Sequence, residues 1–461
     1  MNLKSVNLTM LVDFYELTMA HGYFENGMED QIAYFDMFFR RVPDEGGFAI
    51  MAGLEQLIEY LKHLEFTDED IEYLRSKQLF SEGFLTYLKN FKFACDIYAI
   101  PEGTPIFPNE PILTVRGPII QAQFIETMIL LSINHQSLIA TKSNRIVRAA
   151  NGRPVLELGA RRAQGADGAI LGARAAYIGG CKGTACTISD RDFNVPALGT
   201  MAHSWVQTFD SEYEAFKKYA ELYPENCTLL VDTYNTLKSG VPNAIKVFKE
   251  ILIPKGYKPG AIRIDSGDAA YLSKKARKLL DEAGLHETKI VISNSLDEYI
   301  IKDLLIQNAP IDSFGVGERL ITSKTEPVFG GVYKIVAVEK EGQMIPKIKI
   351  SNNIEKITNP GSKQVYRLYD RDTKKAIADV ITLAHEKIDD TKPYTIFDPE
   401  HTWKRKEITN FIARPLLAPI FLNGQFVYTS PTLEEIVTYS KEQIEMLWEE
   451  VLRFEKPHRY Y

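Results

Sequence analysis

The chain has 461 residues, of which 45% are hydrophobic and 25% charged, so it can bury an ordinary core without disulfide or metal support. No apolar run approaches the roughly 18 residues of a membrane-spanning helix, and the start lacks the charged-then-apolar plan of a signal peptide, so we expect a cytoplasmic protein with no membrane partner. The net charge of −7 is spread along the chain without a basic block, which argues against nucleic acid as a partner.

The cysteines do not indicate a metal or redox site. They fall in no CxxC or Cys/His ligand spacing, so we expect them to be small buried apolar residues. The four are Cys95, Cys181, Cys186 and Cys227.

Residues 1–150 are expected to form an α+β domain. LVDFYELTMAHGYF and AGLEQLIEYLKHL have the spacing of amphipathic helices, whereas IPEGTPIFPNEPILTVRG alternates and turns as strands do.

Residues 151–330 follow a different pattern, in which short apolar, β-rich runs alternate with helix-length amphipathic stretches. Such alternation predicts a parallel sheet with crossover helices. Seven such units, with an eighth supplied irregularly, suit an irregular TIM-like βα barrel, and the predicted fold class is therefore α/β. The runs are PVLELG, YIGGCKGT, ALGTMAH, TLLVDT, AIRIDSG, KIVISNS and IDSFGVG.

Residues 331–461 return to strands and are expected to pack on the N-terminal domain. GGVYKIVAVEKEGQMIPKIKIS is typical of a hairpin, and Asn423-Gly424 within IFLNGQFVY favours a type I′ turn. A final amphipathic helix is predicted over PTLEEIVTYSKEQIEMLWEEVLRF.

Polar or glycine residues stand directly after each apolar run of residues 151–330. In a barrel of parallel strands these ends converge on one face, where catalytic groups gather. Cations there can pair with phosphate or carboxylate, glycines let backbone N–H groups approach phosphate, and Asp side chains can hold Mg²⁺ through water. Any one of these residues alone is more often part of a turn or an N-cap. Their recurrence at the ends of all seven predicted strands is what predicts an anionic, phosphate-bearing substrate. The residues are Arg161, Thr184, His203, Asp232, Asp265, Ser293, Asn294, Gly315 and Gly317.

Three familiar nucleotide motifs are absent. FGVGERL lacks the third glycine of a dinucleotide fingerprint, and no GxxxxGK[ST] sequence forms a P-loop. LLVDTYNT lacks the paired acids and glycine-rich turn of the Rossmann-like phosphoribosyltransferases.

The chain resembles the nicotinate phosphoribosyltransferases, a type II phosphoribosyltransferase family. The resemblance implies an irregular α/β barrel beside an N-terminal domain, and a homodimer with the active site at the subunit interface. It further implies an ATP-dependent ligase of NAD biosynthesis that takes nicotinate and phosphoribosyl pyrophosphate as substrates. The matching segments include LVDFYELTMAHGYF, LELGARRA, GCKGTACT, GTMAHSW, LVDTYNT, IRIDSGD, FGVG and KITNPGSK.

The same resemblance implies roles for single residues. His203 would be phosphorylated by ATP, and Asp265 would stabilise positive charge on the sugar or the pyridine ring. Nicotinate would be held by Tyr15 of the partner subunit together with Arg161 and Thr200. Asp265 and Asp268 could also hold Mg²⁺ through water. Residues expected to bind phosphoribosyl pyrophosphate are Asp232, Arg263, Asp268, Ser293, Gly315, Gly317 and Thr358.

The residue at position 185 bears on the choice between nicotinate and nicotinamide as substrate. The nicotinamide enzymes resemble this chain but place an aspartate there, and a buried aspartate would repel a carboxylate, so alanine beside Arg161 favours nicotinate. Alternatives are a nicotinamide or quinolinate phosphoribosyltransferase, a non-catalytic metabolite sensor on the same scaffold, and a glycoside hydrolase. The last is disfavoured because no Glu follows these strands as an acid–base pair.

Overall fold

The computed structural model describes residues 7–352, 356–399 and 401–460; the first six residues of the segment analysed above for a signal peptide lie outside this range. The chain divides into two compact units, unit 1 (Met1–Leu138 with Val328–Tyr461) and unit 2 (Ile139–Pro327). The domain boundaries expected after residues 150 and 330 stay predictions. No described helix is both long enough and apolar enough to cross a membrane.

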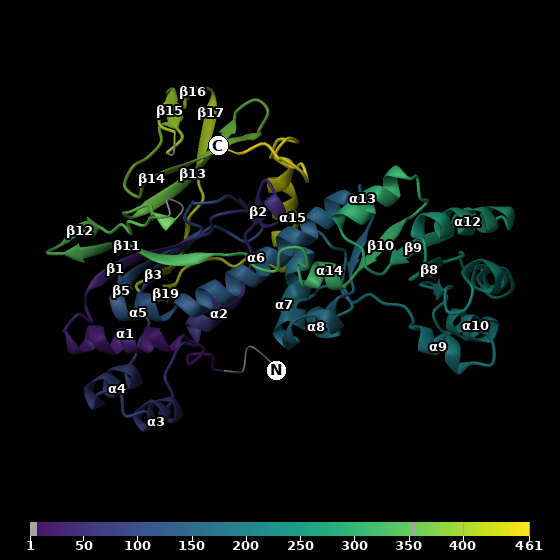
Figure 1. Ribbon diagram of the computed structural model, residues 1–461, viewed down its shortest axis with the longest axis horizontal. Helices are drawn as coiled ribbons and strands as arrows, with labels where there is room; N and C mark the ends of the chain where they lie inside the picture. The colour runs from purple at the N-terminus through teal and green to yellow at the C-terminus, as the bar shows by residue number, and fades with distance from the viewer. Residues whose placement is uncertain (1–6, 353–355, 400, 461) are drawn as a thin grey trace. The chain divides into compact units, whose positions relative to one another are not determined.

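Unit 1 is built on a seven-stranded antiparallel sheet that draws strands from both ends of the chain (Figure 1). The strand order is β12-β11-β1-β5-β3-β18-β19. β1 lies between β5 and β11, so C-terminal strands complete a sheet that the N-terminal segment begins. The strands are β1 (Ile32–Phe38), β3 (Asp96–Ala99), β5 (Leu113–Pro118), β11 (Val332–Lys340), β12 (Gln343–Pro346), β18 (Ala418–Leu422) and β19 (Gln425–Phe426).

The predicted hairpin turn lies between β18 and β19. Asn423 and Gly424 both have positive φ, 49° and 73°, as a type I′ turn requires. A Cβ on Gly424 would lie 1.9 Å from the carbonyl oxygen of Phe93, so glycine is needed for close approach as well as for the turn.

The helices of unit 1 include all three that the sequence predicts. The last of them is shorter than expected: α15 ends at Glu445, where the Lys375 ammonium binds the carbonyl oxygens of Glu445 and Leu447 at 2.8 and 2.9 Å and thereby satisfies helix-end acceptors. The helices are α1 (Phe14–Glu25), α2 (Leu54–Lys62), α3 (Asp68–Ser76), α4 (Glu82–Lys89), α5 (Ile119–Phe124), α15 (Leu433–Glu445) and the short η2 (Pro43–Glu45).

Smaller sheets complete unit 1. A three-stranded antiparallel sheet has the order β14-β13-β17, and two pairs, β2-β4 and β15-β16, stand apart from it. The strands are β2 (Ala49–Ile50), β4 (Pro105–Ile106), β13 (Lys363–Asp370), β14 (Ala376–Leu383), β15 (Tyr394–Phe397), β16 (Arg405–Ile408) and β17 (Phe411–Pro415).

A buried ion pair joins the seven-stranded and the three-stranded sheet of unit 1. Lys363, the first residue of β13, lies 2.8 Å from the Asp36 carboxylate on β1, and both side chains are 5% exposed or less. The Lys363 ammonium also donates to the carbonyl oxygens of Asn359 and Gly361, each at 2.6 Å. All three ammonium donors therefore have partners, and the loop before β13 is tied to the large sheet.

Replacing Lys363 with Met is expected to lower the free energy of unfolding by about 3–5 kcal/mol, because the Asp36 carboxylate stays buried without its cation. Lys89→Met is the control, since the Lys89–Asp68 pair is mostly exposed and exposed ion pairs contribute little to stability. Urea unfolding of both variants measures the difference. Equal losses would contradict the assignment.

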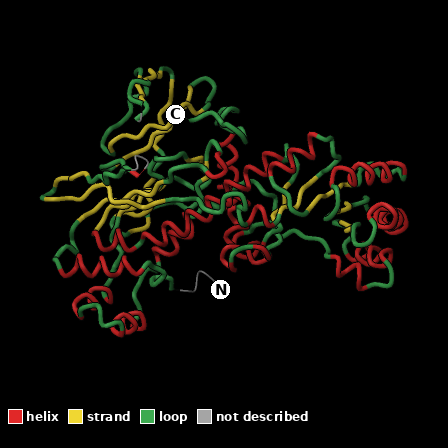
Figure 2. The backbone as a smooth tube through the Cα atoms, viewed as in Figure 1, coloured by secondary structure: helices red, strands yellow, loops and turns green. Residues whose placement is uncertain are grey.

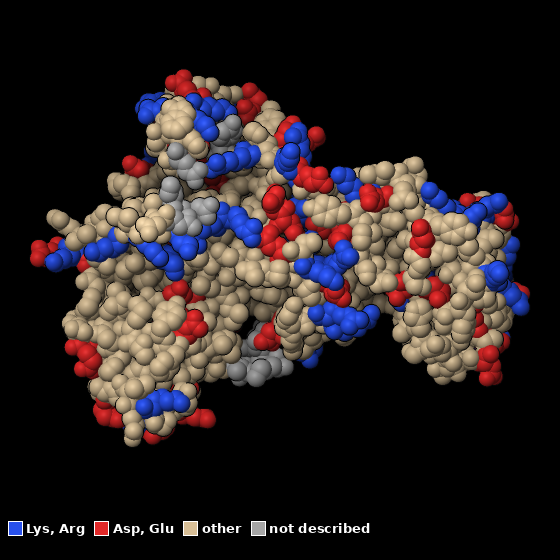
Figure 3. All heavy atoms as spheres, in the orientation of Figure 1, with Lys and Arg blue, Asp and Glu red and all other residues tan. Residues whose placement is uncertain are grey.

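Unit 2 contains a parallel sheet with the strand order β6-β10-β9-β8-β7, and Figures 1 and 2 show helices flanking it. On the face drawn in Figure 3, basic and acidic side chains of this unit are interspersed. The mixed α/β class with a parallel sheet is thus as predicted. The strands are β6 (Val155–Glu157), β7 (Thr228–Leu230), β8 (Ala261–Ile264), β9 (Lys289–Ser293) and β10 (Ser313–Val316).

The helices of unit 2 follow these strands or connect them. The long helix α6 contributes residues to both units. The helices are α6 (Glu126–Ala149), α7 (Gly165–Ile178), α8 (Thr187–Phe193), α9 (His203–Thr208), α10 (Glu212–Leu222), α11 (Val241–Val247), α12 (Ala269–Glu282), α13 (Glu298–Ile306) and α14 (Glu318–Ile321), with short turns η3 (Ala160–Arg162), η4 (Thr236–Gly240), η5 (Phe248–Leu252) and η6 (Ile253–Lys255).

Two of the seven predicted strands are wrong as regular strands. YIGGCKGT begins inside α7 and forms two isolated parallel bridges, both at Thr184, one with Glu157 and one with Ala197. The bridge with Thr184 is the contribution of ALGTMAH. The first segment begins as helix because the Ala-rich sequence of α7 favours helix. The second follows Pro196, which has no N–H to donate to a β-ladder. No pairing joins the Ala197 segment to β7 among the described residues, so the hydrogen-bonded sheet of this part of the chain is open.

Candidate active site

The carboxyl ends of β7 and β8 are tied together by Asp232. Its Oδ2 accepts hydrogen bonds from the Asp265 backbone N–H at 3.0 Å and from the Ser266 hydroxyl at 2.6 Å. Its Oδ1 is buried and has no partner among the described residues. A buried carboxylate oxygen without a donor costs stability, so this oxygen is a natural position for a ligand.

His203 begins α9 and lies against both of these strand ends. Its Nδ1 is 3.1 Å from the Thr233 hydroxyl, and its Nε2 is 3.8 Å from Asp265 Oδ2. Asp265 Oδ1 in turn accepts a hydrogen bond from the Ser293 hydroxyl at the end of β9. The imidazole is 40% exposed, so it is positioned by its neighbours and still open to a reactant.

The guanidinium of Arg263 joins β8 to the segment that leads to His203. It donates to Thr200 Oγ1 at 2.6 Å and to the Met201 carbonyl oxygen at 3.0 Å. Burial lowers the pKa of Arg263, Asp265 and Asp232 oppose that shift, and the charge of Arg161 adds to it. Two guanidinium groups therefore lie close enough to interact, which favours an anion between them.

The loops that carry Arg161 and Ala185 are joined through the buried Glu157 of β6. Glu157 Oε1 accepts from the Gly159 N–H, and Oε2 accepts from the Thr184 hydroxyl at 2.6 Å. Its backbone carbonyl accepts from the Ala185 N–H at 2.8 Å. Burial raises the pKa of Glu157, and the Thr184 hydrogen bond opposes the rise. Arg161 itself is exposed in η3.

Three predicted site residues have structural explanations. Asp268 is exposed and caps α12, where Oδ1 accepts from the Tyr271 N–H at 2.8 Å. A Cβ on Gly315 would lie 2.5 Å from a methyl carbon of Leu158, and one on Gly317 would lie 3.2 Å from the Leu158 carbonyl oxygen. No contact joins these residues to His203 in the described part of the chain.

Tyr15 and Thr358 belong to unit 1 rather than to the parallel sheet. Tyr15 is 45% exposed on the first turn of α1, and burial together with Glu126 raises its pKa. Thr358 is buried, and its hydroxyl accepts from the Lys349 N–H at 3.2 Å.

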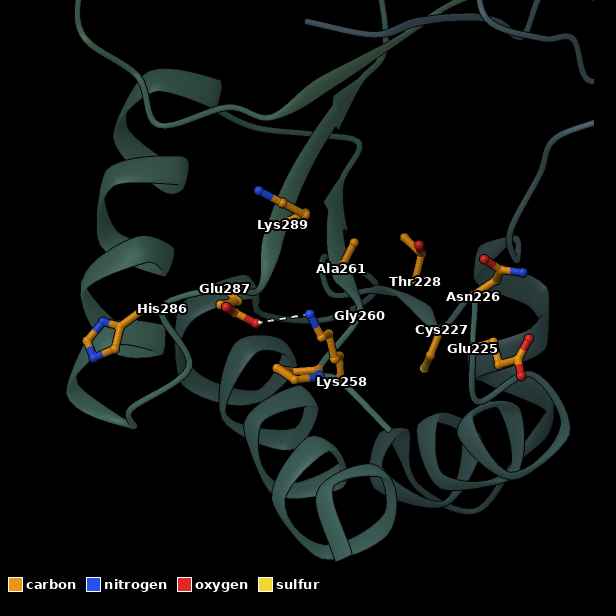
Figure 4. Close-up of a pocket in the computed structure, with 11 residues that line it drawn as sticks. Glu225, Asn226, Cys227, Thr228, Lys258, Gly260, Ala261, His286, Glu287 and Lys289 are labelled. Carbon is orange, nitrogen blue, oxygen red and sulfur yellow. Dashed lines mark ion pairs between the residues drawn. The ribbon is translucent and has the colours of Figure 1, made fainter. Parts of the chain in front are cut away.

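A cavity of about 640 Å³ opens at the opposite ends of these strands (Figure 4). It is lined by the first residues of β7, β8 and β9, which are Thr228, Ala261 and Lys289. An ion pair of 3.9 Å between Lys258 and Glu287 crosses it. It includes none of the predicted site residues, and those of unit 2 lie toward the opposite, carboxyl ends of the strands. No group of three or more potential metal-ligating side chains occurs among the described residues.

Comparison with known proteins identifies the family. Family models for the N-terminal and C-terminal domains of nicotinate phosphoribosyltransferase (NAPRTase) match residues 10–134 and 362–461. The chain is 45% identical to the nicotinate phosphoribosyltransferase of Bacillus subtilis, covering 99% of this chain and 93% of that protein. The chain belongs to the nicotinate phosphoribosyltransferase family. The resemblance drawn from the sequence motifs is thereby confirmed.

Other family members and solved structures agree with this assignment. The nicotinate phosphoribosyltransferase of Mycobacterium tuberculosis is 39% identical, covering 95% of this chain and 87% of that protein. The crystal structure of human nicotinic acid phosphoribosyltransferase superposes with a TM-score of 0.85 at 28% identity, covering 97% and 96% of the two chains. Nicotinate-nucleotide pyrophosphorylase from Pyrococcus furiosus gives 0.72 at 27% identity, covering 96% of each chain.

Two residues of this family member's cluster were missed in the sequence. Thr233 contacts His203, and its signal was a hydroxyl directly after the strand-end acid Asp232. Glu157 joins two loops, and its signal was a carboxylate inside an otherwise apolar strand, which has to find donors when buried.

Beside Tyr15, Glu16 is expected to make stability depend on pH. Burial raises its pKa from 4.5 to about 8, Glu126 adds to the rise, and the Thr127 hydrogen bond opposes it. The folded state therefore holds a proton that the unfolded state has released, and stability is full below pH 4.5 and falls as pH rises toward 8.

We expect the unfolding free energy of the wild type to fall by about 2–4 kcal/mol between pH 4.5 and 8 because of Glu16, and this fall to be absent in Glu16→Gln. Urea unfolding at pH 5.5, 7 and 8.5 measures it. Glu59→Gln, at a partly exposed position on α2, is the matched control and should keep the wild-type slope. An unchanged slope in Glu16→Gln would show that Glu16 does not bind the proton.

Proposed function

We propose that this protein catalyses the ATP-dependent joining of nicotinate to phosphoribosyl pyrophosphate, giving nicotinate mononucleotide and pyrophosphate in the salvage route of NAD biosynthesis. The observation that carries the proposal is His203 held between Thr233 and Asp265, beside the Arg263 guanidinium. The names of the most similar family members support the same reaction. The activity would class the enzyme as a ligase in the cytoplasm.

Nicotinate would bind between the Arg161 and Ala185 loops. Arg161 pairs with the carboxylate, Thr200 lies at the same end of the sheet, and Ala185 leaves room without adding a negative charge. Tyr15 would come from the partner subunit of a homodimer, because it is half-exposed on α1 of unit 1 and would stack on the pyridine ring.

Phosphoribosyl pyrophosphate would bind across the ends of β7 to β10. Asp232 and Arg263 face the ribose and pyrophosphate, Ser293, Gly315 and Gly317 face the 5′-phosphate, and Thr358 comes from unit 1. Its pyrophosphate would carry Mg²⁺, which needs only one or two protein carboxylates when phosphates supply the other ligands. The unpartnered Asp232 Oδ1 and the partly exposed Asp265 fit that requirement, and Asp268 fits it less well because it caps α12.

In the reaction the pyridine nitrogen would form a bond to the anomeric carbon as the bond to the pyrophosphate oxygen breaks. Pyrophosphate leaves with the electron pair, and Mg²⁺ when bound neutralises its charge. The nicotinate nitrogen carries no proton to remove, so the protein contributes positioning and electrostatics. Asp265 would stabilise the positive charge that develops on the sugar. Phosphorylation of His203 would add about two negative charges and so couple ATP hydrolysis to substrate binding.

We also propose that the open sheet of unit 2 curls into an irregular barrel. Arg263 lies next to the edge strand β7, and its two hydrogen bonds reach residues 200 and 201, just beyond the Ala197 bridge at the other edge. A side chain thus links the two edges where a ladder of backbone hydrogen bonds would close a regular barrel.

The test mixes the purified protein with Mg²⁺, phosphoribosyl pyrophosphate and labelled nicotinate, nicotinamide or quinolinate, with and without ATP. Mononucleotide is expected from nicotinate, and its formation should rise with ATP. His203→Ala is expected to keep slow ATP-independent transfer and lose the stimulation. His286→Ala, at the opposite ends of the strands, is the control and should keep it. Full stimulation in His203→Ala would remove the assigned role, and product from quinolinate alone would overturn the proposed reaction.

Arg161→Ala is expected to raise KM for nicotinate by about 10- to 100-fold, because a charge-assisted contact contributes roughly 1.5–3 kcal/mol. Any turnover of nicotinamide, which carries no charge, should change little. Steady-state kinetics with both substrates provides the measurement. An unchanged KM for nicotinate would exclude Arg161 as the carboxylate ligand.

A further inference from the structure

The loop after β9 has an unfavourable backbone conformation, which other contacts have to stabilise. Asn294 and Ser295 have φ of 84° and 53°, and the left-handed region is unfavourable for two consecutive non-glycine residues. Both residues are exposed, so packing of their side chains does not offset that cost. The constraint has to come from the residues that follow them.

Asp297 supplies one constraint at the end of this loop. Its Oδ1 caps α13 by accepting from the N–H groups of Tyr299 and Ile300 at 3.1 and 2.9 Å. Its Oδ2 accepts from the guanidinium of Arg319 on α14, the helix that follows β10. The Asp297 side chain is 5% exposed and that of Arg319 is 34% exposed. One carboxylate thus joins the loops that follow two neighbouring strands.

The next residue fixes the same point to the rest of unit 2. Glu298 is fully buried, and its Oε1 lies 2.9 Å from both the Lys142 ammonium and the Arg145 Nε of α6. Breaking such buried contacts is costly, so the start of α13 cannot shift easily. Arg319 consequently ties α14, the helix that follows β10, to this buried anchor.

Both loops offer backbone donors at this place. In the described part of the chain, the N–H groups of residues 294–296 and of residues 317–319 donate no hydrogen bond. β9 and β10 pair directly, with Ser293 opposite Gly315. Two groups of free N–H donors therefore flank adjacent strand ends, an arrangement that suits a phosphate oxygen on each side.

We propose that the Arg319–Asp297 ion pair is a positioning pair that sets the spacing of these two loops around the 5′-phosphate of the sugar substrate. The inference rests on the proposed function, which places that phosphate beside Ser293, Gly315 and Gly317. Arg319 acts here through Asp297 and does not itself bind the phosphate. Its cation is already engaged by a buried carboxylate, and the phosphate is held by backbone donors.

The test compares Arg319→Met, Asp297→Asn and the double variant with wild type. Asn retains the N-cap of α13 but loses the ion pair. We expect both single variants to raise the Kd of ribose 5-phosphate, measured by calorimetry, and KM for phosphoribosyl pyrophosphate by roughly tenfold, the equivalent of one charge-assisted contact. The double variant should be no worse than either single one, kcat and KM for nicotinate should change less than twofold, and Arg319→Lys should restore part of the affinity.

Lys324→Met is the matched control, because it removes the 2.7 Å pair of Lys324 with Glu318 on the same helix without touching Asp297. It should bind ribose 5-phosphate as wild type does. If Asp297→Asn keeps or strengthens binding while Arg319→Met loses it, Arg319 is a direct phosphate ligand and the positioning role is wrong. Additive losses in the double variant would also overturn it. A wild-type protein that neither binds ribose 5-phosphate nor turns over phosphoribosyl pyrophosphate would instead overturn the proposed function.

Discussion

The arrangement of the candidate site depends on the guanidinium of Arg263. The segment between Ala197 and His203 has one backbone bridge, from Ala197 to Thr184. Arg263 holds Thr200 and Met201 of this segment against β8. Arginine stays charged in proteins, so burying it requires acceptors in fixed positions, and a lysine could not satisfy two in one plane. His203 follows Met201 by two residues, so the hydrogen bonds of Arg263 also place the His203 imidazole near Asp265. A side chain, rather than backbone pairing between strands, thus positions this segment at the strand ends.

The same site is left electrostatically incomplete. Asp232 Oδ1 and Arg263 Nε are both buried without a partner among the described residues, and each such group costs about 1–3 kcal/mol. A protein selected for stability alone would pair them. An anionic substrate that brings its own cation would satisfy both at once, which is why a phosphorylated sugar with Mg²⁺ suits these residues better than a neutral ligand does.

Local sequence patterns predicted those elements whose own residues favour the conformation that they adopt in the structure. The five paired strands of unit 2, the Asn423-Gly424 turn and the three helices predicted in unit 1 all followed from hydrophobic spacing and turn residues. The start of the segment that leads to Thr184 belongs to the Ala-rich α7, and Thr184 itself is held by Glu157, a tertiary contact that no local pattern records. The segment that begins at Ala197 follows Pro196, which cannot donate to a ladder. For Asp268 the commoner structural explanation, an N-cap, accounts for its contact. The place of Tyr15 and Thr358 beside the strand ends stays a prediction, since it depends on how separate parts of the chain and a second subunit come together.

Glu157 bears on how the site would choose its substrate. Arg161 and Ala185 lie in different loops. The distance between the Arg161 guanidinium and the Ala185 side chain therefore depends on how the two loops are held relative to each other. The Glu157 carboxylate accepts from Gly159 in one loop and from Thr184 in the other, so that distance follows from one buried side chain. Preference for a carboxylate over an amide would then depend on spacing as well as on charge, because a charge-assisted contact weakens quickly when its partners are held apart. Substitutions at Ala185 act on a loop whose position Glu157 already sets, and their effects should differ when that carboxylate is removed.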